Sequence, residues 1–364
     1  MDGCFTISTF IPTVPRTRRE PVDSARTFST IAKTVKDAGL LRRAQWFYAL
    51  LGGGLFLALG GVITGFVLLG DSWFQLLMAA ALGIIFTQYA FMAHEAAHRQ
   101  VMASGPSNDR VGRFLGVFVV GMSYSWWMNK HTRHHANPNQ IGRDPDIDPD
   151  VVVFLDDDAR AQRGFMRKVT AKQGWLFYPL LTFEGYNLHY HSLRWLFQKG
   201  KLEGRWLELS LIALRFALYL GAIFAFLPLG MAFAFVGVQM AVFGFYMGSS
   251  FAVNHIGMPI IPAEARLDFF RKQVLTSRNV SGGVWANALL GGLNYQVEHH
   301  LFPNMARPYL ARARKLVMEY SRQQDIPYTE MNLARAHVHV AKYINQVGLK
   351  AKEPFVCPVM AAYR

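Results

Sequence analysis

The chain has 364 residues, of which 52% are hydrophobic and 17% charged; soluble domains carry about 25% charged residues, so the composition argues against a disordered or fibrous protein and points to a membrane. The net charge of +14 favours a surface facing anionic lipids and acidic cofactors over nucleic acid, because the chain contains no compact basic motif. The two cysteines, Cys4 and Cys357, form no CxxC pair, which argues against a disulfide scaffold, a cysteine-bound zinc and a cysteine-bound iron–sulfur cluster.

Long runs without charged residues predict membrane-spanning helices. Residues 44–70 and 72–93 are each long enough to cross ~30 Å of hydrocarbon at ~1.5 Å per residue, and they are separated by a tight turn. A second run, Phe216–Ala263, is too long for one span and breaks at Pro228, because proline and the glycine that follows end helices. The sequence therefore predicts two helical hairpins, with spans at residues 44–70, 72–93, 206–227 and 231–254.

The flanking charges predict the orientation of these spans. Lysine and arginine precede the first and third spans and follow the second and fourth, whereas the two short turns carry neither residue. By the positive-inside rule, both termini and both large connecting segments are cytoplasmic. We therefore predict an N-terminal arm without a signal peptide over residues 1–43, a membrane domain over 44–305 and a cytoplasmic helical segment over 306–364.

Two shorter apolar stretches, Phe114–Asn129 and Gly174–Phe183, are expected to lie in the membrane interface, with Trp126 and Trp127 at headgroup depth. The first is too short for an ordinary span and has basic residues at both ends. Arg215 lies inside the third predicted span, where an unpaired charge is costly, so it must face protein or lie near the interface.

Histidines form three tight groups in the motifs HEAAH, HTRHH and QVEHH. Positions four apart share one face of a helix, so two imidazoles of one motif can reach the same centre. The predicted topology places all three groups and the histidine after the fourth span on the cytoplasmic side, provided that Phe114–Asn129 does not cross. This gives eight candidate metal ligands, too many for one zinc and enough for two metals: His94, His98, His131, His134, His135, His255, His299 and His300.

Two other classes of protein compete with this interpretation. HEAAH has the form of the zinc-protease motif H-E-x-x-H, in which the glutamate is the general base, and an intramembrane metalloprotease would also be apolar. Such a site leaves the other six histidines unexplained, and the fourth span offers no aspartate as a further ligand. A metal-ion transporter would place its histidines within the spans, which are nearly free of ionisable residues.

The three motifs, in this order around two predicted hairpins, resemble the histidine boxes of the membrane fatty acyl desaturases over roughly residues 30–330. Gln296, in place of the first histidine of the third box, resembles the front-end or linoleoyl-type subgroup, and bacterial, actinobacterial-type members most. The resemblance implies an all-α integral membrane fold of the bacterial inner membrane, whose cytoplasmic helical cap holds a non-haem di-iron centre. It also implies O₂ as co-substrate and a cis double bond introduced into a long acyl chain carried by coenzyme A, by acyl carrier protein or by a lipid.

The resemblance assigns further roles. His255 matches the additional family ligand before the third box, His189 is a plausible ninth ligand, and Gln296 lies close to the metal without being a strong ligand. Eukaryotic front-end relatives often carry a fused cytochrome domain that supplies electrons. We see no such domain in this sequence, so we expect a separate ferredoxin- or oxidoreductase-like protein to donate the electrons. A fatty acyl hydroxylase or ketolase on the same scaffold stays open, because the boxes do not distinguish these outcomes.

Carboxylates close to the boxes are candidates to accept hydrogen bonds from ligand imidazoles. They are Asp144, Asp146, Glu95 and Glu298, and Asp148 has a similar position after the second box. His191, His337 and His339 are expected to be surface residues.

Overall fold

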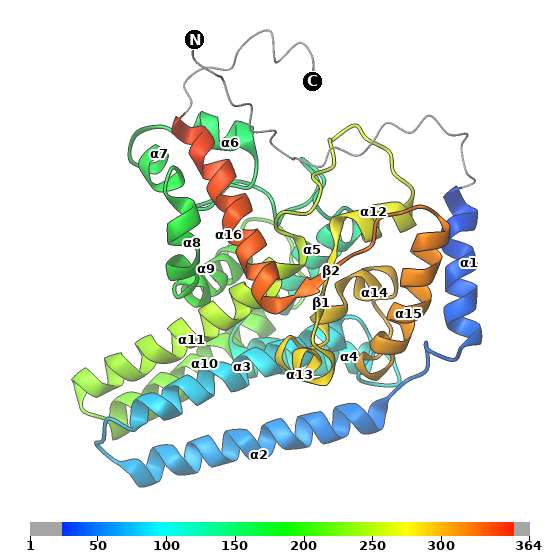
Figure 1. Cartoon of the computed structure of the whole chain (residues 1–364). Coiled ribbons are helices and arrows are strands. Elements are labelled where there is room, and N and C mark those ends of the chain that lie inside the picture. Colours follow the sequence, from blue (N-terminus) through cyan, green and yellow to red (C-terminus); the bar gives the residue numbers. More distant parts are fainter. Residues whose placement is uncertain (1–23, 353–364) are drawn as a thin grey trace.

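The computed structural model describes residues 24–352 and is mostly helical (Figure 1). Cys4 and Cys357 lie outside the described residues. The prediction of four helices long and apolar enough to cross a membrane is confirmed: they are α2 (Gln45–Leu69), α3 (Gln75–Ala97), α10 (Arg205–Phe226) and α11 (Leu229–His255).

The helices α3 and α11 pack closely against each other in the middle of this group, with α2 against α3 and α10 against α11. Close approach is possible because Gly83 of α3 faces the backbone of α11. A Cβ at this position would lie 2.8 Å from the carbonyl oxygen of Gln239. Helix α3 extends past the charge-free run that ends at residue 93 and so carries His94, and α11 ends at His255.

The stretch Phe114–Asn129 is not the single helix that we expected. After α4 (Gly105–Arg113), a π-helical segment η1 (Phe114–Val120) ends at Gly121, whose φ of 97° is left-handed, and α5 (Tyr124–Ala136) starts a new axis. Glycine adopts this φ without steric cost, so it permits the break. Ser123 caps α5 by accepting a hydrogen bond from the backbone N–H of Trp126.

The end of η1 also helps to explain how α10 can bury the guanidinium of Arg215. Nε of Arg215 donates to the carbonyl oxygen of Val119 at 3.5 Å. Its guanidinium carbon lies 4.4–5.1 Å from the ring centroids of Phe86, Phe216 and Tyr219. Cation–π contacts and a carbonyl that a helix end leaves free replace part of the lost hydration. This arginine faces protein, one of the two settings that the sequence required.

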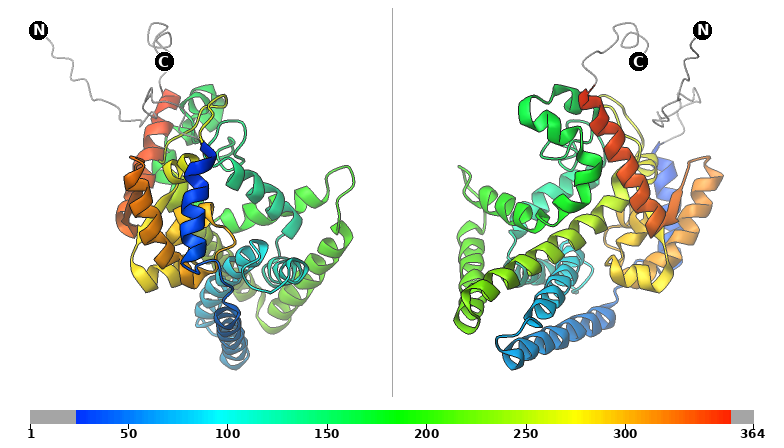
Figure 2. Two further views of the ribbon diagram at one scale, coloured as in Figure 1. Left: turned by 90° about the vertical axis from the view of Figure 1, so that its right-hand side faces the viewer. Right: turned by 60° about the vertical axis from the view of Figure 1, so that its left-hand side comes forward.

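The other elements surround the C-terminal ends of α3 and α11. Helix α1 packs against α12 and α15, while α8 packs against α16 and α11 (Figure 2). Their bounds are α1 (Ser24–Asp37), α6 (Asp156–Ala161), α7 (Gly164–Thr170), α8 (Gln173–Leu181), α9 (Glu184–Leu196), α12 (Phe269–Thr276), α13 (Gly283–Leu289), η2 (Leu293–Tyr295), α14 (Gln296–Leu301), α15 (Arg307–Gln323), α16 (Leu333–Leu349) and η3 (Lys350–Lys352).

A small sheet corrects the all-α expectation. Strand β1 (Arg278–Ser281) pairs in parallel with β2 (Thr329–Asn332), with Arg278 opposite Thr329. Four-residue strands carry too short a pattern to be recognised from sequence, and their pairing depends on tertiary packing. The sheet joins the chain before α14 to the chain after α15, on either side of the third histidine box.

Candidate metal centre

Four separate segments bring their histidines together at the C-terminal ends of α3 and α11. Helix α3 and its C-cap contribute the first box, α5 the second, the last residue of α11 a single histidine, and α14 the third. Ligand spacing within α5 follows from helix geometry, since residue 131 lies one turn before residues 134 and 135. The eight predicted histidines fall into two groups.

The first group has five members, and the nitrogen atoms through which they could bind a metal all lie within 4.8 Å of one another. Nε2 of His131 is 2.9 Å from Nε2 of His94 and 2.8 Å from Nε2 of His98. Nε2 of His299 is 3.1 Å from Nε2 of His135. The members are His94, His98, His131, His135 and His299.

The second group contains His134, His255 and His300. Nε2 of His134 lies 3.3 Å from Nε2 of His255, and the side-chain nitrogen of Gln296 lies 2.9 Å from the same atom of His255. The amide of Gln296 is therefore at the edge of this group, and its oxygen accepts a hydrogen bond from Asn254 at 3.1 Å.

These distances fit the donor set of a metal centre. Metal–imidazole bonds are about 2.1 Å long, which places neighbouring ligand nitrogens about 3 Å apart, close to the spacings found here. Nε2 of His300 is buried without a hydrogen-bond partner in the described structure, a costly state for a polar atom unless it binds something. The residues present therefore fit two metal ions, one in each group.

Contacts behind the second group orient its rings. Nδ1 of His134 lies 3.0 Å from Oδ1 of Asp144, Nδ1 of His255 donates to the carbonyl oxygen of Thr276 at 2.9 Å, and Nδ1 of His300 donates to Oε1 of Gln273 at 2.9 Å. A ring that donates through Nδ1 keeps the lone pair of Nε2 free for a metal. Asp144 thus lies where it can accept a hydrogen bond from His134, and Asp146 lies 3.3 Å from the same nitrogen of His134.

The electrostatics favour neutral imidazoles over most of the centre. Burial holds the pKa of His131, His135, His299 and His300 well below the ordinary value, and neighbouring imidazoles lower it further. Burial also lowers the pKa of His98 to about 4. Neutral histidine is the form that ligates metals, so these rings are ready for ligation at neutral pH.

Adjacent residues serve different groups at two places. In α5, His134 belongs to the second group and His135 to the first; in α14, His299 belongs to the first and His300 to the second. The rings of His135 and His300 are stacked, with centroids 4.2 Å apart and planes at 7°. The two groups are therefore joined both through peptide bonds and through ring contact.

Glu95, which sequence reasoning placed as a hydrogen-bond acceptor for a ligand, instead forms a buried ion pair with Arg307. Nε of Arg307 donates to Oε1 at 2.7 Å and Nη2 donates to Oε2, while the hydroxyl of Tyr48 donates to Oε1 at 3.2 Å. Both carboxylate oxygens are thus engaged away from the histidines. This arrangement contradicts the metalloprotease alternative, in which the glutamate must be free to act as a base.

Glu298 also makes its contacts away from the ligand rings. It accepts hydrogen bonds from Nδ2 of Asn279 and from the hydroxyl of Tyr328, both at 2.8 Å. Burial raises the pKa of Glu298 to about 7, despite these two hydrogen bonds. Because Asn279 lies on β1 and Tyr328 immediately precedes β2, this contact fixes α14 against the sheet.

His189 lies outside both groups. Its Nδ1 is 2.7 Å from the carbonyl oxygen of Gly185 and its Nε2 is 3.3 Å from that of Val120 at the end of η1. The ring packs beside Phe216 and Phe243. Its environment is the η1–α10 contact, which the histidine motifs gave no means to predict.

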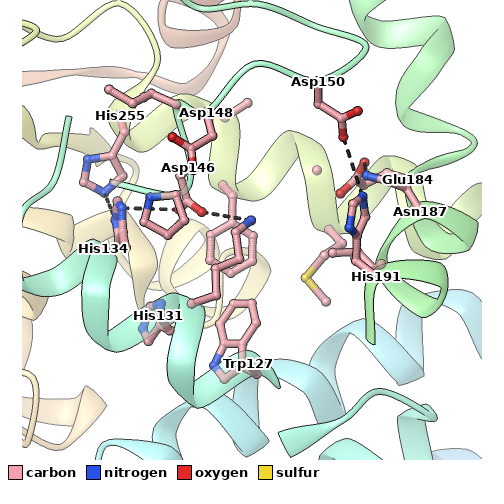
Figure 3. A pocket seen from close by; sticks show the side chains of 18 of the residues that line it. Trp127, His131, His134, Asp146, Asp148, Asp150, Glu184, Asn187, His191 and His255 are labelled. Atoms are coloured by element: carbon pink, nitrogen blue, oxygen red, sulfur yellow. Dashed lines mark hydrogen bonds and ion pairs between the residues drawn. The ribbon is translucent and has the colours of Figure 1, made fainter. Parts of the chain in front are cut away.

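A cavity of about 830 Å³ opens beside the histidines, within the usual range of ligand sites. Its lining is largely apolar and includes side chains of α3 and α11; Trp127 lines it too, and the centroid of its ring lies 4.8 Å from that of His131, on which it is stacked. Figure 3 shows His134 and His255 at one side and Glu184, Asn187 and His191 at the other. Lys130, another residue that lines the cavity, pairs with Asp146 at 2.9 Å.

Several functional positions were missed or misplaced by sequence reasoning. Gln273 and Thr276 have no motif that marks them, whereas Trp127 lies four residues before His131, so its place on the same helix face as that histidine could have been predicted. His191, expected at the surface, is half-buried and lines the cavity, with Asp150 at 3.6 Å; Asp148 lines the cavity too. His337 is also half-buried and bonds to the hydroxyl of Tyr178 at 2.8 Å, while His339 is exposed.

The fold and the site define a membrane protein whose buried histidine groups can hold metal beside a largely apolar cavity. The chain belongs to the fatty acid desaturase family: the model of the family described as fatty acid desaturase matches residues 71–332. It is accordingly an oxidoreductase of that family.

Three relatives illustrate the similarity. The chain is 28% identical to the Delta(6)-fatty-acid desaturase fat-3 of Caenorhabditis elegans over 319 residues; this alignment covers 83% of this chain and 70% of that protein. It is 26% identical over 347 residues to the Delta(8)-fatty-acid desaturase of Helianthus annuus, covering 91% and 75%. It is 26% identical over 329 residues to the Delta(5) fatty acid desaturase fat-4 of Caenorhabditis elegans, covering 83% and 69%.

Proposed function

We propose that this protein is an O₂-dependent di-iron desaturase that introduces a cis double bond into a long-chain fatty acyl group of an acyl-CoA or an acyl-lipid. The observation that carries the proposal is the convergence of two histidine groups on one cavity with a largely apolar lining. Binding and orienting an acyl chain past those histidines is what this cavity can do.

In this proposal the first iron is held by His94, His98, His131, His135 and His299. The second is held by His134, His255 and His300, with Gln296 as a candidate fourth ligand. The amide nitrogen of Gln296 faces His255 here, so ligation would require the amide to turn its oxygen toward the metal. The asymmetry of five histidines against three supports this place for Gln296, because its amide already lies at the edge of the smaller group. His189 is left out of the ligand set because both its nitrogens face backbone carbonyls.

Bound iron with O₂ supplies the oxidising power that removes hydrogen from unactivated methylene groups, a task beyond protein acids and bases. The protein positions the substrate. Apolar lining residues such as Ala90, Phe91 and Met247 would pack against the methylene groups of the chain, and the positive charges of Lys130 and Arg194, which also line the cavity, would attract its carboxyl end. The ring of Trp127, stacked on His131, would lie beside the chain.

We further propose front-end regioselectivity, in which the new bond lies close to the carboxyl end. The support is the glutamine of the third box together with relatives named Delta(6), Delta(8) and Delta(5) desaturases.

The membrane arrangement is also part of the proposal. Four helices in two hairpins cross the bilayer, residues 44–305 form the membrane domain, and residues 1–43 and 306–364 lie with the metal centre on the cytoplasmic side. The asymmetric distribution of lysine and arginine supports this orientation. A bacterial inner membrane stays a prediction, since the relatives described above come from a worm and a plant. Electrons come from a separate redox protein.

Expression in a host that lacks polyunsaturated lipids, followed by mass spectrometry of its acyl chains, tests the function. We expect products two hydrogens lighter than their precursors, with the position of the double bond given by fragmentation. A gain of one oxygen would instead support the hydroxylase or ketolase alternative. Metal analysis of the purified protein should find two irons per chain, and treatment with a chelator should abolish activity until ferrous iron is restored.

A further inference from the structure

A second, strongly polar crevice of about 540 Å³ is formed by the chain that follows the second histidine box, by residues 264–267 and by the first turn of α12. Three basic residues, Arg143, Arg266 and Lys272, and one carboxylate, Glu264, line it together with neutral side chains. Arg143 and Arg266 are exposed, and burial and the nearby charge of Arg143 lower the pKa of Lys272. The crevice is thus a cationic surface whose charges act on each other.

Lys272 is held toward the crevice by neutral oxygens. Its Nζ donates to Oδ1 of Asn137 and Oε1 of Gln140, both at 3.2 Å, and to the carbonyl oxygen of Ala136 at 3.4 Å. These three acceptors follow the second histidine box directly. Their dipoles fix the lysine without neutralising its charge, so the charge is left to attract an anionic partner.

Two pairs of adjacent residues connect this surface to the metal centre. Lys272 faces the crevice, while the next residue, Gln273, accepts a hydrogen bond from Nδ1 of His300. Arg143 faces the crevice, while the next residue, Asp144, contacts Nδ1 of His134. Both histidines belong to the second group, so the crevice is one residue away from two rings of the same metal site.

We propose that this crevice is the docking surface of the electron donor, a soluble redox protein with an acidic face around its cofactor. The inference rests on the proposed function, which requires electrons from outside the chain. Charge complementarity steers such a partner to the crevice, and the contacts from Lys272 through Gln273 to His300 give a short route for the electron. Helix α12 lies far from the turns that link the long apolar helices, where a soluble protein has access (Figure 1).

The test measures anaerobic reduction of the iron-loaded enzyme by stopped-flow absorbance, with two acidic probes: a plant-type [2Fe–2S] ferredoxin and a b-type cytochrome. The variant R143E/R266E reverses two exposed charges of the crevice, and R312E/K315E makes the same change of charge on exposed positions of α15. Neither pair touches a histidine ligand in the described contacts. Dithionite reduction of each variant shows whether its iron centre is intact.

We expect R143E/R266E to lower the second-order rate constant for reduction by an acidic probe at least tenfold at low salt. The dependence of that rate on ionic strength should also become weaker. R312E/K315E should keep the wild-type rate, and dithionite should reduce all three proteins equally.

Three results would overturn the proposal. One is equal loss of rate in both variants; another is no reduction of the wild-type iron by either probe while dithionite reduces it. The third is an unchanged reduction rate in R143E/R266E with a raised KM for acyl-CoA, which would make the crevice a phosphate site. A wild-type protein that binds no reducible iron at all would contradict the proposed function itself, and is distinguished from the other results by the dithionite control.

Discussion

Gln273 accepts the Nδ1 hydrogen of His300 across 2.9 Å, and the nitrogen of the same amide donates to the carbonyl oxygen of His135, also across 2.9 Å. One buried side chain therefore fixes a ligand of the second group and the backbone of a ligand of the first. Residues behind metal ligands contribute strongly to affinity, typically about 10–100-fold when they are removed.

The first prediction concerns this amide. Gln273→Leu should lose about 10–100-fold in iron affinity, because His300 is left free to rotate and to protonate Nε2. Gln273→Glu keeps an acceptor for Nδ1 and should retain iron, with an altered absorption spectrum. Titration of the metal-free protein with ferrous iron measures both affinities. Equal binding by the leucine variant and the wild type would remove Gln273 from the centre.

The second prediction separates ligand histidines from the histidine at η1. His189→Gln should leave two irons per chain, because the side chain contacts backbone carbonyls and aromatic rings instead of the centre. His255→Gln should bind less than the full complement, because it takes one of only three imidazoles from the second group. Metal analysis of the two purified variants decides the matter; iron loss in His189→Gln would restore that residue as a ligand.

The third prediction concerns the buried pair of Glu95 and Arg307, whose side chains are 4% and 3% exposed. Arg307→Met leaves the carboxylate of Glu95 buried without its partner, which should cost about 3–5 kcal/mol of unfolding free energy. Arg322→Met breaks the exposed pair with Glu319 on α15 and should not change stability measurably. Denaturation of both variants in the same detergent provides the comparison. Similar curves for the two would show that the buried pair is not important for the fold.

The fourth prediction concerns the contact between α3 and α11. Gly83→Ala places a methyl group 2.8 Å from the carbonyl oxygen of Gln239 and 3.0 Å from Cβ of Val242, so it should destabilise the protein by about 1–3 kcal/mol. Gly60→Ala in α2 meets nothing within 4 Å and serves as the control. Thermal inactivation of both variants checks the difference. An unaffected Gly83→Ala protein would mean that the helices can separate without cost.

Much of the fold follows from the sequence because apolar runs and histidine spacing are local patterns. The four long helices come directly from the runs without charge, and the approach of the boxes follows from where those runs end. The distribution of histidines between two groups could not be predicted, since it depends on how far α5 and α14 are rotated about their axes. The contact of Gln273 with the histidines could not be predicted for a similar reason: no local pattern tells which polar residue of a short helix faces inward.

Some errors have a physical cause that the sequence conceals. Phe114–Asn129 has the length and composition of one interfacial helix, but Gly121 lets the chain turn and start α5. Glu95 follows His94 in a motif that suggests catalysis, yet its partner is Arg307, more than two hundred positions later. Tertiary contacts of this kind override what a motif suggests.

The adjacent histidines of α5 and α14 have a mechanical consequence. A trans peptide holds successive Cα atoms about 3.8 Å apart. On each of the two helices, one residue of the first group is therefore tied at a fixed backbone distance to one residue of the second. Neither group can therefore be displaced on its own: a shift or rotation of α5 or α14 that moved a ligand of one group would carry a ligand of the other with it. Ions held by the two groups would share one frame built from these two helices.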